Sequence, residues 1–147
     1  MIKKGYSFPT VFAVAVALLL IFYPQMGKSE SPRTITLSSG EVVCDLNGEW
    51  NALFDYYAGC AWGGKQKVIL QIKQEGNKFV VIKLSGGDPT TKGDEVIRGE
   101  LDQKGFKTVE KYAGRLGWAL CKGEITDACK KMVIDHEGCT QVALDRK

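Results

Sequence analysis

The chain has 147 residues, of which 44% are hydrophobic and 25% are charged, the composition of a single globular domain. Its formal net charge is +3, but three of the 20 basic residues and none of the acidic ones lie in the first 29 positions, which leaves 17 groups of each sign in the rest of the chain. A neutral domain lacks the positive surface that nucleic acid or an anionic membrane binds, so both classes of partner are excluded.

Residues 1–29 have the three-part order of a secretory signal peptide. Lys3 and Lys4 precede an unbroken apolar run over residues 11–23, and a polar segment with small residues follows it. The apolar run is shorter than the roughly 20 residues that a membrane-spanning helix needs. We therefore expect a signal helix that is cleaved after Ser29, which gives a secreted or periplasmic protein whose membrane contact is through the leader before cleavage. An uncleaved anchor is the alternative.

After the leader, polar residues 30–43 predict a tether, and residues 44–147 predict a single domain of short strands. The first strand opens at Gly48-Glu49-Trp50 and ends near Tyr57. Residues 67–84 are the clearest element, because period-2 alternation, a polar turn with a glycine and a β-branched return run predict a β-hairpin. Turn residues then separate five more strand-like runs. These runs are residues 94–101, 106–112, 118–125, 131–135 and 139–146.

About eight short strands at regular spacing predict an all-β domain. The connections after the second, fourth and sixth strands are short, whereas those after the first, third and fifth are longer and rich in glycine. This alternation indicates an antiparallel up-and-down β-barrel, with its long loops gathered at one open end. A two-sheet sandwich is the alternative. A barrel of about eight strands either fills its interior with side chains or holds one small ligand.

A ligand would enter at the open end, where aromatic side chains and one arginine are expected. These residues are Tyr56, Tyr57, Trp62, Tyr112, Arg115 and Trp118. Their chemistry predicts a small apolar or aromatic ligand. The same side chains can instead cap the core of a solid barrel, or grip a protein, because Tyr and Trp are enriched at protein interfaces.

The start of the first strand carries a family resemblance. Gly48-Glu49-Trp50 is similar to the Gly-x-Trp that begins lipocalins and the wider calycin group. In that family an arginine near the end of the last strand packs over the tryptophan at the closed end of the barrel, which implies this role for Arg146 and Trp50. A guanidinium over an indole is a cation–π contact of about 0.5–2 kcal/mol. The resemblance implies a lipocalin-like barrel of avidin size that binds a small molecule.

Five cysteines in an exported chain predict two disulfides and one remaining thiol. In the expected barrel, Cys44 and Cys129 both lie at the closed end, and Cys60 and Cys139 both lie at the open end. The predicted pairs are therefore Cys44–Cys129 and Cys60–Cys139, with Cys121 unpaired and buried in its strand. Cys60–Cys121 is the rival pairing.

Catalytic and metal sites are not indicated, and no cofactor is expected. The one histidine, His136, lies in a turn and is expected in solvent. A catalytic dyad of His136 and Cys139 is not expected, because Cys139 is predicted to be oxidised and no oxyanion hole can be recognised in the sequence. A zinc site of cysteines and His136 would have irregular spacing, and Asp88, Asp94 and Glu95 offer too few oxygen ligands for calcium.

We therefore expect an exported, non-catalytic binding protein that takes a small apolar or aromatic ligand at its long-loop end. One alternative is an envelope protein-interaction or enzyme-inhibitor domain that uses the same loops. The other is a solid scaffold barrel that holds no ligand.

Overall fold

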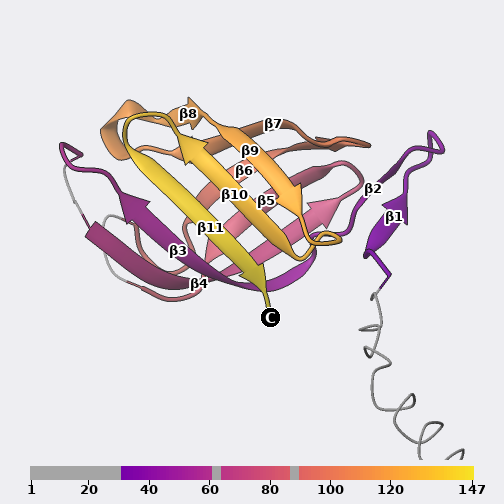
Figure 1. The fold of residues 1–147 in the computed structure, drawn as a ribbon, viewed down its shortest axis with the longest axis horizontal. Helices are drawn as coiled ribbons and strands as arrows, with labels where there is room; N and C mark the ends of the chain where they lie inside the picture. The colour runs from indigo at the N-terminus through magenta and orange to yellow at the C-terminus, as the bar shows by residue number, and fades with distance from the viewer. Residues whose placement is uncertain (1–30, 61–63, 87–89) are drawn as a thin grey trace, which may run out of the picture. The chain divides into compact units, whose positions relative to one another are not determined.

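The computed structural model describes residues 31–60, 64–86 and 90–147. The predicted signal helix, residues 1–29, lies outside the described residues, as do Trp62 and Asp88. Residues 31–147 belong to one unit, which is built almost entirely of β-strands (Figure 1). No helix in the described ranges is long and apolar enough to cross a membrane.

Nine strands form one antiparallel sheet. In sheet order they are β8 (Trp118–Leu120), β7 (Gly105–Tyr112), β6 (Glu95–Asp102), β5 (Lys78–Lys83), β4 (Gly64–Glu75), β3 (Gly48–Tyr56), β11 (Thr140–Arg146), β10 (Lys131–His136) and β9 (Lys122–Thr126). Neighbours in the sheet are consecutive in the chain, except that β3 pairs with β11. That pairing runs from Trp50 opposite Arg146 to Tyr56 opposite Thr140, so the last strand of the meander lies beside the first.

The two edges of the sheet meet at Cys121. β8 pairs with β7 and β9 pairs with β10, and Cys121 is the single residue between β8 and β9. The Cys121 N–H donates to the carbonyl oxygen of Val109 in β7 at 2.9 Å, which extends the pairing past the end of β8. One continuous segment therefore bridges both edges, and the sheet is a nearly closed up-and-down barrel rather than a sandwich. The fold class predicted from the sequence is confirmed.

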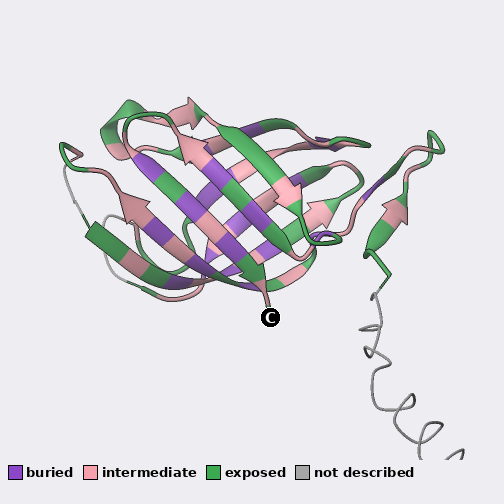
Figure 2. Cartoon of the chain, viewed as in Figure 1, coloured by how far each residue is buried: buried purple, intermediate pink, exposed green. Residues whose placement is uncertain are grey.

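Period-2 alternation along the strands explains why the sheet closes around an apolar interior. In β3, Trp50, Ala52 and Phe54 are buried, and the residues between them are exposed or half-buried. Figure 2 shows this alternation as bands of buried and more exposed residues along the strands. The most buried large side chains include Trp50, Leu70, Ile72, Ile97, Leu101, Ile134 and Leu144, each at most 1% exposed. Removing this apolar surface from water is the main stabilising contribution, at about 25 cal/mol per Å².

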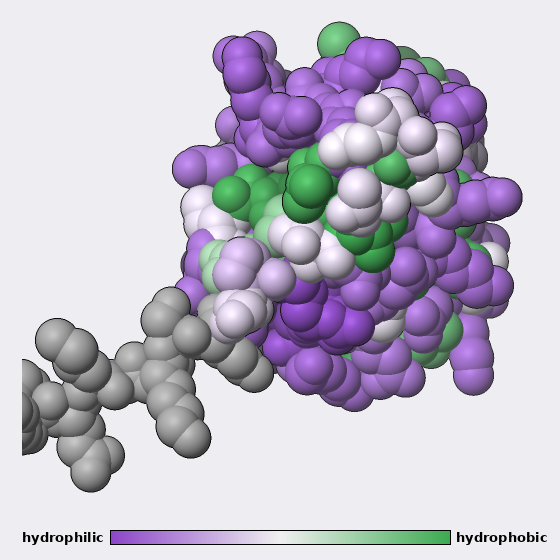
Figure 3. Space-filling view, turned by 90° about the vertical axis from the view of Figure 1, so that its right-hand side faces the viewer, coloured by the Kyte–Doolittle hydropathy of each residue, from purple (hydrophilic) through white to green (hydrophobic). Residues whose placement is uncertain are grey.

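The segment before the barrel is structured, where a tether was expected over residues 30–43. β1 (Thr34–Thr36) and β2 (Val42–Cys44) form a two-stranded antiparallel sheet. Val43 and Leu46 are 2% and 0% exposed and belong to the barrel core, which fixes the segment at the end with the short turns. Figure 3 looks onto this end and shows a small hydrophobic area surrounded by hydrophilic side chains.

Arg146 and Trp50 meet at this closed end, as the calycin resemblance implies. The Arg146 guanidinium lies over the indole at 4.7 Å from the ring centroid. Its Nη1 donates to the Asn47 carbonyl oxygen at 2.8 Å and its Nη2 donates to the Asp45 carbonyl oxygen. The Trp50 Nε1–H donates to the Leu46 carbonyl oxygen at 2.9 Å. Together these contacts fasten the last strand to the segment that leads into β3.

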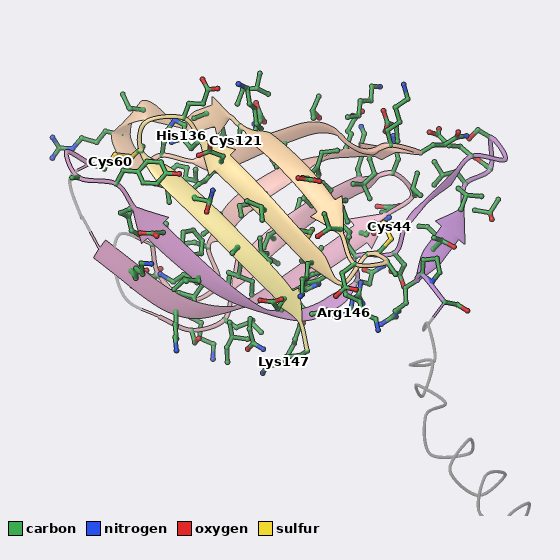
Figure 4. The ribbon with its side chains drawn as sticks, viewed as in Figure 1. Cys44, Cys60, Cys121, His136, Arg146 and Lys147 are labelled. Carbon is green, nitrogen blue, oxygen red and sulfur yellow. A yellow bond between two sulfur atoms is a disulfide. The ribbon has the colours of Figure 1, made fainter. Side chains whose placement is uncertain are left out.

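The four cysteines predicted to pair lie at disulfide distance in the predicted combinations. Cys44–Cys129, with a Cα–Cα distance of 5.7 Å, joins β2 to the turn between β9 and β10. Cys60–Cys139, at 5.5 Å, joins the connection after β3 to the start of β11. Cys121 is free, so the rival Cys60–Cys121 pairing is wrong. Figure 4 shows Cys60 and Cys44 at opposite ends of the barrel. Such pairs fit an oxidising, extracytoplasmic environment.

Candidate functional site

A cavity of about 330 Å³ opens at the end of the barrel that carries the long loops. Its wall comes from β3, β7, β10 and β11, and from the connection that contains the 3-10 helix η1 (Gly114–Leu116). The side chains that give the wall its chemistry are Tyr56, Lys111, Tyr112, Leu116, His136 and Thr140. Small-molecule sites range from about 300 to 1,000 Å³, so this cavity suits a ligand at the small end of that range.

Of the five predicted open-end residues that the structure describes, two line the cavity. Tyr56 ends β3 on its inward face, in continuation of Ala52 and Phe54, and burial raises the pKa of its hydroxyl. Tyr112 ends β7 at the rim and is 38% exposed. The cavity therefore has one phenol ring, that of Tyr56, in its wall, and Tyr112 borders it at the rim.

The other described members of the predicted set lie away from the cavity. Tyr57 follows the inward-facing Tyr56, so it points outward, and its hydroxyl donates to Asp135 Oδ1 at 3.3 Å. Arg115 lies exposed in η1.

Trp118 also lies outside the cavity. Its ring packs edge-on against Tyr112, 5.7 Å between centroids, and beneath the Arg98 guanidinium at 4.1 Å. Side-chain period decides this placement, because Trp118 pairs with Tyr112 in the β7–β8 register and shares its outward direction. The remaining member, Trp62, lies in the part of the chain that the structure does not describe.

Three polar residues of the wall, Lys111, His136 and Thr140, were not predicted from the sequence. Each lies two positions from a core residue on its own strand: Lys111 after Val109, His136 after Ile134, and Thr140 before Val142. Residues at this spacing share one face of a strand, so the alternation itself was the available signal. His136, expected in solvent, is instead half-buried with its side chain in the cavity wall.

Lys111 is buried with little to compensate its charge. Its side chain is 6% exposed, and within the described residues its Nζ donates one hydrogen bond, to the Tyr112 carbonyl oxygen at 3.3 Å. The rings of Phe54 and Tyr56 lie 5.9 and 5.8 Å from Nζ, near the outer limit of a cation–π contact. Among the described residues no carboxylate pairs with this ammonium, and burial lowers the pKa of Lys111 from its ordinary value of 10.5.

Two further polar atoms in the same wall have no partner. Thr140 Oγ1 and His136 Nδ1 are buried and make no hydrogen bond within the described ranges. A buried polar group without a partner costs about 1–3 kcal/mol, so such groups are few in folded proteins. Three polar groups of one cavity wall therefore lack a full set of partners among the described residues.

The free thiol of Cys121 does not supply the missing partner. Cys121 packs against the core and its Sγ donates to the Ala119 carbonyl oxygen at 3.3 Å. Burial raises the pKa of the Cys121 thiol, which keeps it neutral beside Lys111. Figure 4 shows Cys121 and His136 at the same end of the barrel.

Lys83, a second buried lysine at this end, contrasts with Lys111. It is 3% exposed, and its Nζ donates to the Thr90 carbonyl oxygen at 2.7 Å and to Thr90 Oγ1 at 3.2 Å. These bonds hold the connection between β5 and β6 against the barrel. Gly86 in the same connection comes so close that a Cβ there would lie 2.4 Å from Val68 Cγ1. Lys83 therefore has a structural role that Lys111 lacks.

A second hollow, of about 400 Å³, lies on the outer face of β3, β4 and β11. Leu53, Ile69 and Ala143 line it together with Lys67 and Asp145. Buried polar atoms without partners occur in the open-end cavity and not in this outer groove, as far as the described residues go. The open-end cavity is therefore the stronger candidate site.

Comparisons of the chain with protein-family models, with curated proteins and with solved structures found no match. The fold and the site define the class of the protein as an all-β, nearly closed antiparallel barrel with a small cavity at its long-loop end. Two cysteine pairs at disulfide distance, one at each end, complete the description.

Proposed function

We propose that this chain is an exported, non-catalytic binding protein that holds a small ligand with an apolar or aromatic body in the open-end cavity. The observation that carries the proposal is the hollow of about 330 Å³ at the long-loop end of a barrel that has an apolar core. Tyr56 in the wall and Tyr112 and Leu116 at the rim offer contact surface for such a body. A solid scaffold barrel is the less favoured alternative, because side chains would then fill this space.

Membership of the calycin group is part of the proposal. The meander order, the pairing of β3 with β11 and the Arg146–Trp50 contact are compatible with that fold. The resemblance at Gly48-Glu49-Trp50 adds the expectation of small-molecule binding. Export is supported by the cysteine pairs and by the leader predicted over residues 1–29.

The disulfide at Cys139 supports a binding role rather than a catalytic one. Cys139 lies beside His136 in the cavity wall, where a cysteine nucleophile and a base would have been neighbours. Its sulfur is joined to Cys60, so Cys139 offers no thiol for attack beside His136.

Native mass spectrometry of the mature protein purified from its source tests the proposal. We expect an additional organic mass that is lost on unfolding. Ala113→Trp should remove this mass, because Ala113 lines the cavity, whereas Ala143→Trp in the outer groove should retain it. Equal retention by both variants, or no added mass in the unmodified protein, would contradict the proposal.

Docking of an envelope protein at the same end is the second candidate function. It is favoured by Leu116 and Leu120, which are 84% and 72% exposed. Isolated exposed leucines are common on monomeric proteins, so this observation is the weaker one. Affinity capture from an envelope extract with the unmodified protein and with Leu116→Ser tests it, and a partner retained by the first and lost by the second would support it.

A further inference from the structure

We infer that the ligand is a small organic acid, whose carboxylate is bound inside the cavity by Lys111, Thr140 and His136. The inference rests on the proposed function and adds the chemical class of the ligand. The apolar or aromatic body of the acid then lies toward the rim, against Tyr112 and Leu116.

The charge of Lys111 is the first step of the argument. A buried ammonium is unfavourable unless a counter-charge or a full set of acceptors surrounds it. Lys111 is 6% exposed, has one hydrogen bond for its three donors, and has no carboxylate partner among the described residues. Lys83, buried at the same end, has two acceptors from Thr90. The difference indicates that the acceptor for Lys111 comes with a ligand.

The presence of three under-satisfied polar residues in one cavity wall is the second step. Thr140 Oγ1 and His136 Nδ1 are buried, without partners, and in the wall that also contains Lys111. A carboxylate has two oxygens with about four acceptor positions. It can accept from the Lys111 ammonium, from the Thr140 hydroxyl, and from His136 Nδ1 when that nitrogen carries the proton. Bonds of this kind to a charged group are shorter and stronger than neutral ones.

The rim sets the orientation of the ligand. Leu116 is 84% exposed and Tyr112 is 38% exposed, and both belong to the cavity. An acid bound with its carboxylate inward would cover Leu116 with its apolar part. The volume of about 330 Å³ limits that part to one small ring system or a short chain.

A matched pair of ligands tests the inference. 1-Naphthoate and 1-naphthamide have nearly the same shape and differ in charge, and isothermal titration calorimetry measures the affinity of each near neutral pH. For the unmodified protein we expect naphthoate to bind about tenfold or more tightly than naphthamide, the size of a charge-assisted hydrogen bond.

Substitution of two lysines on β7 tests whether Lys111 causes the preference for naphthoate over naphthamide. Lys111→Met should abolish it, because the substitution weakens naphthoate binding far more than naphthamide binding. Lys107→Met is the matched control, because Lys107 is 59% exposed and pairs with Glu100 on the outer face, and the preference should remain. Thr140→Val should reduce the preference by a smaller factor than Lys111→Met.

The outcomes separate this inference from the proposed function. Binding of both compounds with equal affinity, or a preference that persists in Lys111→Met, overturns the acid inference and leaves the binding role intact. Failure of both compounds to bind the correctly folded protein counts against the binding role and the acid inference together. A preference lost only in the cavity variants supports both.

Discussion

The ligand-free barrel would be more stable with a hydrophobic side chain at position 111 than with the buried amine of Lys111. Replacing a buried charge by a hydrophobic side chain of similar volume is often stabilising by about 1–4 kcal/mol. We therefore expect Lys111→Met to raise the free energy of unfolding of the ligand-free protein by about 1–2 kcal/mol, measured by guanidinium chloride denaturation. Lys107→Met should change it by less than about 0.5 kcal/mol, because it alters an exposed position.

The same lysine predicts how that difference varies with pH. Burial lowers the pKa of Lys111 in the folded state below 10.5, so between the two pKa values the unfolded chain binds more protons than the folded one. Stability of the unmodified protein therefore rises with pH in this window, and the advantage of Lys111→Met should shrink as pH approaches 10.5. Tyr56 and Cys121, whose pKa values burial raises, are common to both proteins. If the difference in free energy of unfolding between the two proteins stayed constant or widened as pH rises, the lowered pKa of Lys111 would be contradicted.

Arg146 is the corresponding residue at the closed end, where its role is structural. Arg146→Ala removes the contact over Trp50 and the hydrogen bonds to the carbonyl oxygens of Asn47 and Asp45. We expect a loss of about 2–4 kcal/mol in the free energy of unfolding. Lys147→Ala is the control, because its pair with Glu49 is exposed, and it should cost less than about 0.5 kcal/mol. If the two substitutions had equal effects on the free energy of unfolding, the structural role proposed for Arg146 at the closed end would be contradicted.

Among the elements, the turn between β9 and β10 contains the most unusual backbone. Asp127, Ala128 and Cys129 have φ values of 51°, 52° and 68°, a region that costs a residue with a side chain about 1–2 kcal/mol. Ala128 is exposed, so Ala128→Gly should raise the free energy of unfolding by about 1 kcal/mol. Ala113→Gly, at a φ of −115°, should lower it. Thermal denaturation of both variants measures the two signs, and the same sign in both would contradict this backbone assignment.

The strands of the barrel were predictable because their signal is local. Residues 67–84 contain both the alternation and the turn chemistry of the β4–β5 hairpin, and the turn residues around Gly105 and Gly138 mark two further hairpins. β1 was missed because a three-residue strand in a polar segment has too little period to detect, and burial of Val43 and Leu46 against the core stabilises it. The division of one predicted strand at Cys121 was also missed, since closure of the sheet determines it.

The site was predictable in position but not in chemistry. The open end followed from loop lengths, and Tyr56 and Tyr112 do line the cavity there. Tyr57 and Trp118 were placed by proximity along the chain, whereas the side-chain period turns both outward. Lys111 and His136 lie two positions from Val109 and Ile134, so the same period rule could have placed them inward. Lys111 was not singled out, and His136 was expected in solvent because it lies in a turn.

At the scale of the whole molecule, the two disulfides are expected to stabilise the fold equally, but only one of them lies at the cavity. They close segments of 85 and 79 residues, so chain entropy predicts similar stabilisation, about 2–5 kcal/mol each. Cys60 and Cys139 line the cavity, whereas Cys44 and Cys129 lie at the other end.

Removal of each pair by alanine should therefore lower stability alike but affect binding differently. We expect Cys60→Ala with Cys139→Ala to weaken naphthoate binding at least about fivefold, because the rim is no longer fixed. Cys44→Ala with Cys129→Ala should leave the affinity within about twofold, as measured by calorimetry at a temperature where both variants are folded. A larger effect of the closed-end pair on affinity would contradict a ligand site at the open end.

The central claim is that a ligand occupies the interior of this barrel at its long-loop end. The most direct measurement is of intermolecular nuclear Overhauser effects between the ring protons of 1-naphthoate and the side chains of the isotope-labelled mature protein. We predict contacts to Tyr56, Tyr112 and Leu116, and a shift of the Lys111 side-chain resonances on binding. Contacts to Leu53 and Ile69 in the outer groove instead, with Lys111 unchanged, would contradict the account.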